Sequence, residues 1–272
     1  MTTTKNLVPT VDTIIAAKRQ YLAERKAKTP IEAVRALASM QKRPQPILST
    51  VSNDGRALVI GRIVYSMLDK GPDTYDPVGT ALRYARARVD AVALFTDMTI
   101  YQGGLDDLML VSRAVNIPVI SQDYILEEYQ VVETRAAGAS AVILSSSVLD
   151  RALLRTLVSA SQRNRMTAIV QVENEDELAY ALSLSPHVIG LSKTDPDSRR
   201  LDMDAICRLR PMIPHHIRVM ITDPLESFED VKTAASLRVD AIMVSDALLS
   251  DGDKIQRLQT MLNPARSNGD NS

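Results

Sequence analysis

Four aspartates each follow a short apolar run, and they are the side chains of this sequence best placed to take part in chemistry. Such runs are typical of buried parallel strands, whose carboxyl ends meet at one edge of a sheet. Carboxylates gathered there can bind a divalent cation through oxygen ligands; alternatively, each aspartate caps the helix after its strand. No histidine accompanies the aspartates and their spacing matches no metal motif, so we favour capping and predict no metal site. The four residues are Asp97, Asp123, Asp223 and Asp246.

Two basic residues lie near the end of the first apolar run. Arg62 and Lys70 are suited to holding an anionic ligand at the same edge. In the other interpretation Arg62 pairs with one of the aspartates, because a buried arginine needs a partner. Both interpretations stay open. The histidines, His187, His215 and His216, precede apolar runs, so we expect them on the opposite side, as surface residues.

The elements that must position these residues are clearest in residues 118–149. An apolar run ends near Ser121, an amphipathic helix is predicted over 127–137, Gly138 ends that helix, and a second apolar run covers 141–144. A strand, a helix and a strand within about thirty residues form a βαβ unit, whose two strands are parallel.

The same unit repeats along the chain, which predicts a single (β/α)8 TIM barrel of the α/β class. The predicted strands cover 57–65, 91–95, 118–121, 141–144, 167–172, 188–191, 218–222 and 241–244. The predicted helices cover 76–88, 105–114, 127–137, a segment ending near 163, 175–183, 203–210, 227–237 and 254–262. A doubly wound sheet is the alternative, but its G-x-G-x-x-G turn does not occur.

The domain organisation follows from these elements. Residues 1–45 form an N-terminal helical extension, with helices over 11–28 and 31–40 and Asp12 as the first N-cap. Residues 46–262 form the barrel, and the polar residues 263–272 are predicted to be a disordered tail.

Composition narrows the classes of partner. The formal net charge is −1, so no nucleic-acid or anionic-membrane partner is predicted. The single cysteine, Cys207, allows no internal disulfide and fits a reducing compartment. No apolar run approaches membrane-spanning length, so a soluble cytoplasmic protein is expected.

From Val11 to Leu262 the chain resembles the indole-3-glycerol phosphate synthase family. The segments that carry the resemblance are AAKRQYLAERK near the start, PVISQDYILEEYQVVETRAAGASAVIL in the middle and SFEDVKTAASLRVDAIMVSDALL near the end. The resemblance implies closure of the indole ring of an anilino-ribulose phosphate, with loss of CO₂ and water. It also implies a lysine acid, a glutamate base, a second lysine for the carboxylate and a phosphate cradle, all at the C-terminal face of the barrel.

The positions that match those functional residues carry other side chains. Glutamine has no titratable proton and arginine stays charged, so neither replaces a general acid or base. By the same resemblance, Asp223, Pro224 and Ser245 stand where the phosphate cradle of the family has a serine and two glycines, and Asp246 follows Ser245. The carboxylates of Asp223 and Asp246 repel a phosphate. The replaced catalytic positions are Arg62, Val64, Gln122, Gln171, Ser192 and Thr194.

The sequence therefore predicts a catalytically inactive barrel that has been reused as a binding or structural protein, with an unidentified protein partner and no cofactor. Two alternatives stay open: an active synthase of tryptophan biosynthesis, which would be a carbon-carbon lyase, and a barrel that binds a different small ligand. The candidate ligand-binding residues at the mouth are Arg62, Lys70, Asp123, Tyr124, Asp223 and Asp246.

Overall fold

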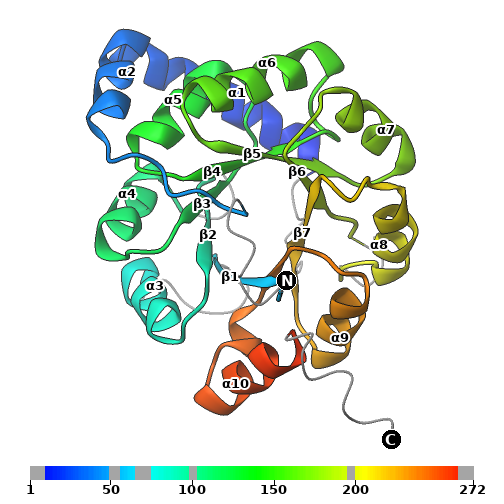
Figure 1. Ribbon diagram of the computed structural model, residues 1–272. Coiled ribbons are helices and arrows are strands. Elements are labelled where there is room, and N and C mark those ends of the chain that lie inside the picture. Colours follow the sequence, from blue (N-terminus) through cyan, green and yellow to red (C-terminus); the bar gives the residue numbers. More distant parts are fainter. Residues whose placement is uncertain (1–9, 49–55, 65–74, 98–102, 195–199, 263–272) are drawn as a thin grey trace, which may run out of the picture.

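Eight parallel strands close into a barrel in the order β1-β2-β3-β4-β5-β6-β7-β8, which confirms the predicted fold class (Figure 1). The computed structural model describes residues 10–48, 56–64, 75–97, 103–194 and 200–262. The strands are β1 (Leu58–Ile63), β2 (Ala91–Phe95), β3 (Val119–Gln122), β4 (Ala141–Ser145), β5 (Thr167–Val172), β6 (Val188–Leu191), β7 (Arg218–Leu225) and β8 (Ala241–Val244).

In the described part of the chain, one outer α-helix follows each strand and two more α-helices precede β1. The first two are α1 (Val11–Lys28) and α2 (Ile31–Met40). The outer ring consists of α3 (Pro77–Arg86), α4 (Leu105–Ala114), α5 (Glu128–Ala136), α6 (Arg151–Arg163), α7 (Glu175–Ser183), α8 (Met203–Leu209), α9 (Phe228–Ser236) and α10 (Gly252–Met261). No helix in these described ranges is long and apolar enough to span a membrane.

Two local details differ from the sequence-based predictions. The N-cap of α1 is Thr10, whose hydroxyl accepts from the Thr13 backbone, so the prediction of Asp12 was wrong. Strand β7 continues to Leu225 instead of ending at 222, with an irregular register between Ile221 and Leu225. Pro224 lies in this irregular part, where a residue without a backbone N–H is tolerated in a sheet.

The strands are buried on both faces, which explains why they are continuous apolar runs rather than alternating patterns. Apolar side chains without aromatic rings fill the interior of the barrel, among them Ala91, Ala93, Ile120, Ile143 and Met220. Their neighbours along the strands, such as Val92 and Leu94, face outward and pack under the helices. This close packing holds the strand ends, and hence the mouth of the barrel, in fixed positions.

The base of the barrel contains a repeated polar clamp. The Asp90 carboxylate accepts from the Val59 backbone N–H at 2.8 Å and pairs with Arg56 at 2.7 Å. Asp240 repeats the arrangement, accepting from Val219 at 2.8 Å and from the Arg218 guanidinium at 2.7 Å. In each clamp, the aspartate just before one strand binds the backbone of the preceding strand. These interactions therefore stabilise the bottom of the barrel.

Candidate functional site

The carboxyl ends of seven strands surround a pocket of about 490 Å³ at the mouth of the barrel. It receives Arg62 from β1, Gln122 from β3 and Gln171 from β5. Asp123, Tyr124, Ser192, Thr194 and Asp223 line it as well, so most of the predicted site residues are brought together. Functional sites of (β/α)8 barrels lie at this face.

Two glutamines line the pocket. Gln122 is the last residue of β3 and Gln171 lies near the end of β5. The side-chain carbonyl oxygen Oε1 of Gln122 is buried and has no hydrogen-bond donor in the described part of the chain. Arg62 also lines the pocket, with its guanidinium 6.0 Å from the centre of the Phe95 ring. Neither glutamine offers a titratable proton to a bound molecule.

On the opposite wall, Asp223 faces Ser192. The Ser192 hydroxyl donates to the Asp223 carboxylate at 2.6 Å. Thr194 forms an isolated antiparallel bridge with Leu201, which places both residues at the rim. Asp223 lies within β7, whereas Ser227 caps α9, so the prediction that Asp223 is a helix cap was wrong.

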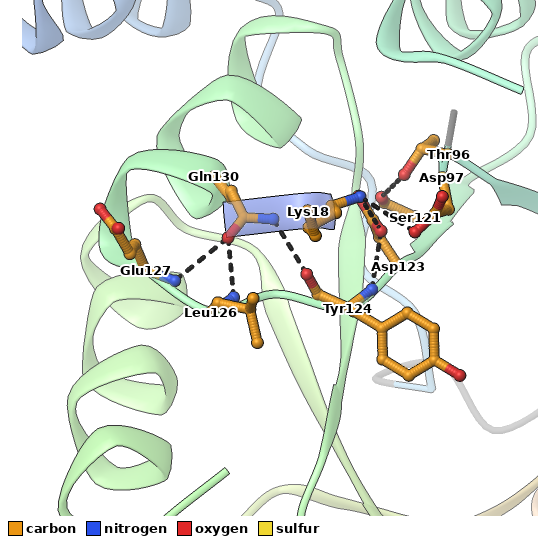
Figure 2. Close-up of polar contacts among 9 residues, drawn as sticks. All are labelled: Lys18, Thr96, Asp97, Ser121, Asp123, Tyr124, Leu126, Glu127 and Gln130. Atoms are coloured by element: carbon orange, nitrogen blue, oxygen red, sulfur yellow. Dashed lines mark hydrogen bonds and ion pairs between the residues drawn. The ribbon is translucent and has the colours of Figure 1, made fainter. Parts of the chain in front are cut away.

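Asp123 does not cap a helix either, because it is paired with a lysine from the extra helix α1 (Figure 2). The Lys18 ammonium contacts the carboxylates of both Asp123 and Asp97, the latter at 3.4 Å, and all three side chains are almost completely buried. Burial raises the pKa of Asp123, and the positive charge of Lys18 opposes that rise. The pair fixes α1 against the mouth of the barrel.

The turn that carries Asp123 and Tyr124 is held by one buried glutamine, Gln130 of α5 (Figure 2). Its oxygen accepts from the backbone of Leu126 at 2.7 Å and of Glu127 at 3.1 Å. Its amide nitrogen donates to the Tyr124 carbonyl at 2.9 Å. These three bonds satisfy the backbone of the turn, so the strand end that carries Gln122 and Asp123 is pre-organised.

Asp246 lies outside the mouth pocket. Its carboxylate accepts from the Tyr84 hydroxyl at 2.9 Å and from Arg83 at 2.8 Å, both on α3. It therefore points toward α3, and it makes no cap hydrogen bond to the short 3₁₀ helix η3 (Asp246–Leu248). The prediction of Asp246 as a helix cap was wrong for this reason. Asp97 is no cap either, since Gly104 precedes α4 and Asp97 contacts Lys18.

Two further predicted positions do not belong to the described lining of this pocket. Val64 follows β1 and is half-buried outside the pocket lining. Lys70 lies outside the described residues, so the role predicted for it, to hold an anionic ligand, stays a prediction.

The residues alone did not point to Glu173, which follows β5 and lines the pocket. Burial raises the pKa of Glu173, and the charges of Glu177 and Asp223 raise it further. Glu177 is anchored by the Ser146 hydroxyl at 2.6 Å and by the Glu173 backbone N–H at 2.9 Å. The sequence feature that could have pointed to Glu173 is its position immediately after a predicted strand. A carboxyl group with a raised pKa in a pocket is a candidate proton donor.

Among the described residues that line the mouth, acidic side chains outnumber basic ones. Arg62 and Arg200 line it together with five carboxylates. Among the residues that the structure describes, there is no group of three or more histidine, cysteine, aspartate or glutamate side chains arranged to hold a metal ion. The five carboxylates are Asp123, Glu173, Asp223, Glu226 and Asp230.

A model of the indole-3-glycerol phosphate synthase family matches residues 11–261, nearly the whole chain. The chain belongs to that family. Proteins named indole-3-glycerol phosphate synthase are similar to it along almost their full length. The one from Mycobacteroides abscessus is 28% identical over 245 residues, which is 89% of this chain and 90% of that protein. The one from Campylobacter jejuni is 25% identical over 256 residues, 93% of this chain and 99% of that protein.

Membership of the indole-3-glycerol phosphate synthase family accounts for the barrel, the extra helix α1 and the location of the pocket. It does not by itself decide the reaction, because different side chains on one barrel support different functions. That question rests on the groups at the strand ends.

Proposed function

We propose that this member of the indole-3-glycerol phosphate synthase family does not catalyse the ring closure and serves instead as a binding or structural protein. The observation that carries the proposal is the pair of glutamines, Gln122 and Gln171, at the strand ends that line the mouth. By resemblance, these are the positions of a lysine acid and a glutamate.

The expected loss of rate is large. A positioned general acid or base contributes roughly 10²–10⁴-fold to a reaction. Gln122 cannot donate a proton as an ammonium does, and Gln171 cannot act as a carboxylate base. Arg62 stays protonated at all ordinary pH values, so it is not a base either.

Charge at the mouth argues in the same direction. The family's substrate carries a phosphate and a carboxylate, whereas the described residues of the pocket lining include two arginines and five carboxylates, of which Asp123 is paired with Lys18. A carboxylate about 4 Å from a phosphate charge costs roughly 4 kcal/mol at an intermediate effective dielectric. A helix N-terminus contributes about 0.3–1 kcal/mol in favour of an anion. A neutral or cationic polar ligand therefore suits the pocket better than the sugar phosphate.

The decisive experiment is an assay of the purified protein with the anilino-ribulose phosphate, monitored by indole fluorescence. The relative from Mycobacteroides abscessus is the positive control, because it bears the synthase name. We expect no turnover above background, and no rescue of a tryptophan auxotroph that lacks the synthase. Turnover or rescue would refute the proposal.

A second candidate function is an active synthase with a rearranged set of catalytic groups. The observation that favours it is Glu173, a pocket carboxyl whose pKa is raised by burial and by Glu177 and Asp223. Such a group can hold a proton for a leaving hydroxyl. If activity is found, the Glu173→Gln variant tests whether Glu173 is the catalytic group. The variant should lose activity if Glu173 transfers the proton and should keep it if another group does.

A protein partner is the remaining part of the proposal. The rim around Tyr124 and the face of α1 around Tyr21 are the contact surfaces we propose, because half-exposed tyrosines are enriched at interfaces. The loop around Tyr101, proposed on the same grounds, lies outside the described residues. A Tyr124→Ala variant should weaken partner binding without changing the melting temperature by more than a few degrees.

A further inference from the structure

Five arginines line one groove on the outside of the barrel, far from the mouth. The groove has a volume of about 630 Å³ and lies between α2, the segment that follows it, α5 and the end of α6, which are neighbours in Figure 1. Among the described residues that line it, Glu128 is the one acidic side chain. The arginines are Arg35, Arg43, Arg135, Arg163 and Arg165.

The acidic residue compensates only part of this charge. One oxygen of Glu128 is shared by two guanidinium groups, that of Arg163 at 3.0 Å and that of Arg35 at 3.7 Å. No carboxylate in the described part of the chain pairs with Arg43, Arg135 or Arg165. The groove therefore has a large excess of positive charge in a protein whose formal net charge is −1.

Arg135 is the most telling of the five, because its side chain is buried. Its guanidinium donates to the backbone carbonyls of Gln41 and Lys42, which are neutral acceptors. Burial lowers the pKa of Arg135, and the neighbouring charge of Arg165 lowers it further. A buried cation without a counter-charge is unfavourable, and an anion in the groove would relieve this cost.

A purely structural role explains only some of these residues. Arg135 and Arg163 lie in the last turns of α5 and α6, where a cation stabilises the negative end of the helix dipole. Arg35 and Arg43 do not lie in the last turn of a helix, and Arg43 makes no ion pair in the described ranges. Arg165 has a backbone φ of 59°, the left-handed region, and precedes β5. Helix stabilisation therefore does not account for the convergence.

We propose that this groove binds a small molecule that carries two or more phosphate groups. Guanidinium groups bind phosphate oxygens through paired, charge-assisted hydrogen bonds, and five of them exceed what a single carboxylate or phosphate can use. The buried side chains of Ala38 and Val132 form an apolar part of the wall. A long nucleic acid is disfavoured, because the protein as a whole carries no excess of positive charge.

The groove continues into a second hollow at the base of the barrel, which has room for the rest of such a ligand. This hollow, of about 1040 Å³, shares Arg43, Pro44 and Arg165 with the groove and extends to His187 and His216. A nucleoside polyphosphate and a bisphosphorylated sugar have the same phosphate chemistry. They differ in what they would place in this second hollow.

The test is calorimetric titration of the whole protein with tripolyphosphate, ADP, fructose 1,6-bisphosphate and inorganic phosphate at low salt. We expect saturable binding of tripolyphosphate that weakens as salt rises, and binding of inorganic phosphate at least about tenfold weaker. Tighter binding of ADP than of the sugar bisphosphate identifies the nucleotide class, and the reverse order identifies the sugar class. Equal affinity for inorganic phosphate and tripolyphosphate would overturn the requirement for several phosphates.

Charge-reversal variants locate the site. Arg43→Glu should weaken tripolyphosphate binding at least about tenfold, since Arg43 is exposed and its side chain has no described polar contact. Arg113→Glu, an exposed arginine in the last turn of α4, is the matched control and should change the affinity by less than about twofold. Arg200→Glu at the mouth is the second control. Absence of saturable binding, or equal weakening by all three variants, would overturn the proposal.

Discussion

Lys18 on α1 forms a buried ion pair with Asp123 at the end of β3, 105 residues away in the sequence. The same ammonium contacts Asp97 after β2, so one lysine joins the extra helix to two adjacent strand ends. Asp123 follows Gln122, the position at which the family resemblance implies a catalytic lysine. The extra helix thus supplies a lysine to this strand end, but its charge is engaged in holding the fold.

Replacement of Lys18 by methionine should be strongly destabilising. It leaves the buried carboxylates of Asp97 and Asp123 without their shared cation, and loss of one partner of a buried pair typically costs about 3–5 kcal/mol. Urea unfolding at pH 7 measures the effect. Arg19→Met, one residue along on an exposed position, is the control and should cost less than about 0.5 kcal/mol. A loss below about 1 kcal/mol for Lys18→Met would contradict the pairing.

The effect of Lys18→Met should depend on pH in a defined direction. A carboxyl whose pKa is higher in the folded than in the unfolded protein stabilises the fold at low pH and loses that contribution as the pH rises through the folded pKa. Burial raises the pKa of Asp123, Lys18 opposes the rise, and the variant should raise it further. The difference in unfolding free energy between wild type and variant should therefore shrink as the pH falls from 7 toward about 4.

Gly61 on β1 should not tolerate a side chain. A Cβ at this position would lie 2.4 Å from the ring of Tyr84, which is completely buried on α3. Gly61→Ala should therefore cost about 1–3 kcal/mol through overpacking. Tyr84→Phe keeps the ring and loses the hydroxyl, which donates to Asp246 at 2.9 Å and contacts the Arg62 carbonyl at 3.4 Å, and this should cost about 0.5–1.5 kcal/mol. Thermal unfolding checks both values, and the opposite ranking would show that the strand can move away from the ring.

The turns between helices and strands offer a stabilising substitution. Gly138 and Arg238 each follow a helix in a left-handed conformation, with φ of 97° and 52°. Arg238→Gly should stabilise the protein by about 0.5–1 kcal/mol, because a left-handed conformation costs a residue with a Cβ about 1–2 kcal/mol and part of the gain is lost as chain entropy. Gly138→Ala should destabilise it, since the new Cβ would lie 2.4 Å from the Ser112 hydroxyl. Stabilisation by both variants would contradict this account.

Neutralisation of Asp223 should make the mouth more receptive to phosphate. Asp223→Asn removes one of the five pocket carboxylates and keeps a group that can accept from Ser192. We expect a gain of between about fivefold and a thousandfold in affinity for inorganic phosphate, because a like charge about 4 Å away costs about 1 kcal/mol in bulk water and about 4 kcal/mol at an intermediate effective dielectric. The titration is made in the Arg43→Glu background, so that the outer groove does not contribute. Asp253→Asn, an exposed aspartate on α10, should leave the affinity unchanged; tight phosphate binding before the substitution would refute the prediction.

The sequence alone determined the barrel. Parallel strands buried on both faces must be continuous apolar runs, and runs such as Ala141 to Leu144 have that pattern. Gly138 marked the end of the helix predicted over 127–137, and in the structure it lies between α5 and β4. The resemblance to the synthase family and the positions of Gln122 and Gln171 at strand ends also followed from residue order, because a strand end in sequence is a strand end in space.

The tertiary structure decided what each charged side chain contacts. Asp123 pairs with Lys18 and Asp246 binds Arg83 and Tyr84, although the residues next to each aspartate predicted a helix cap. Caps are local, so sequence suggests them readily, whereas ion pairs between elements more than a hundred residues apart leave no local pattern. The outer groove could not be predicted from the sequence for the same reason. Its five arginines come from four separate segments that become neighbours only when α2 packs on α5.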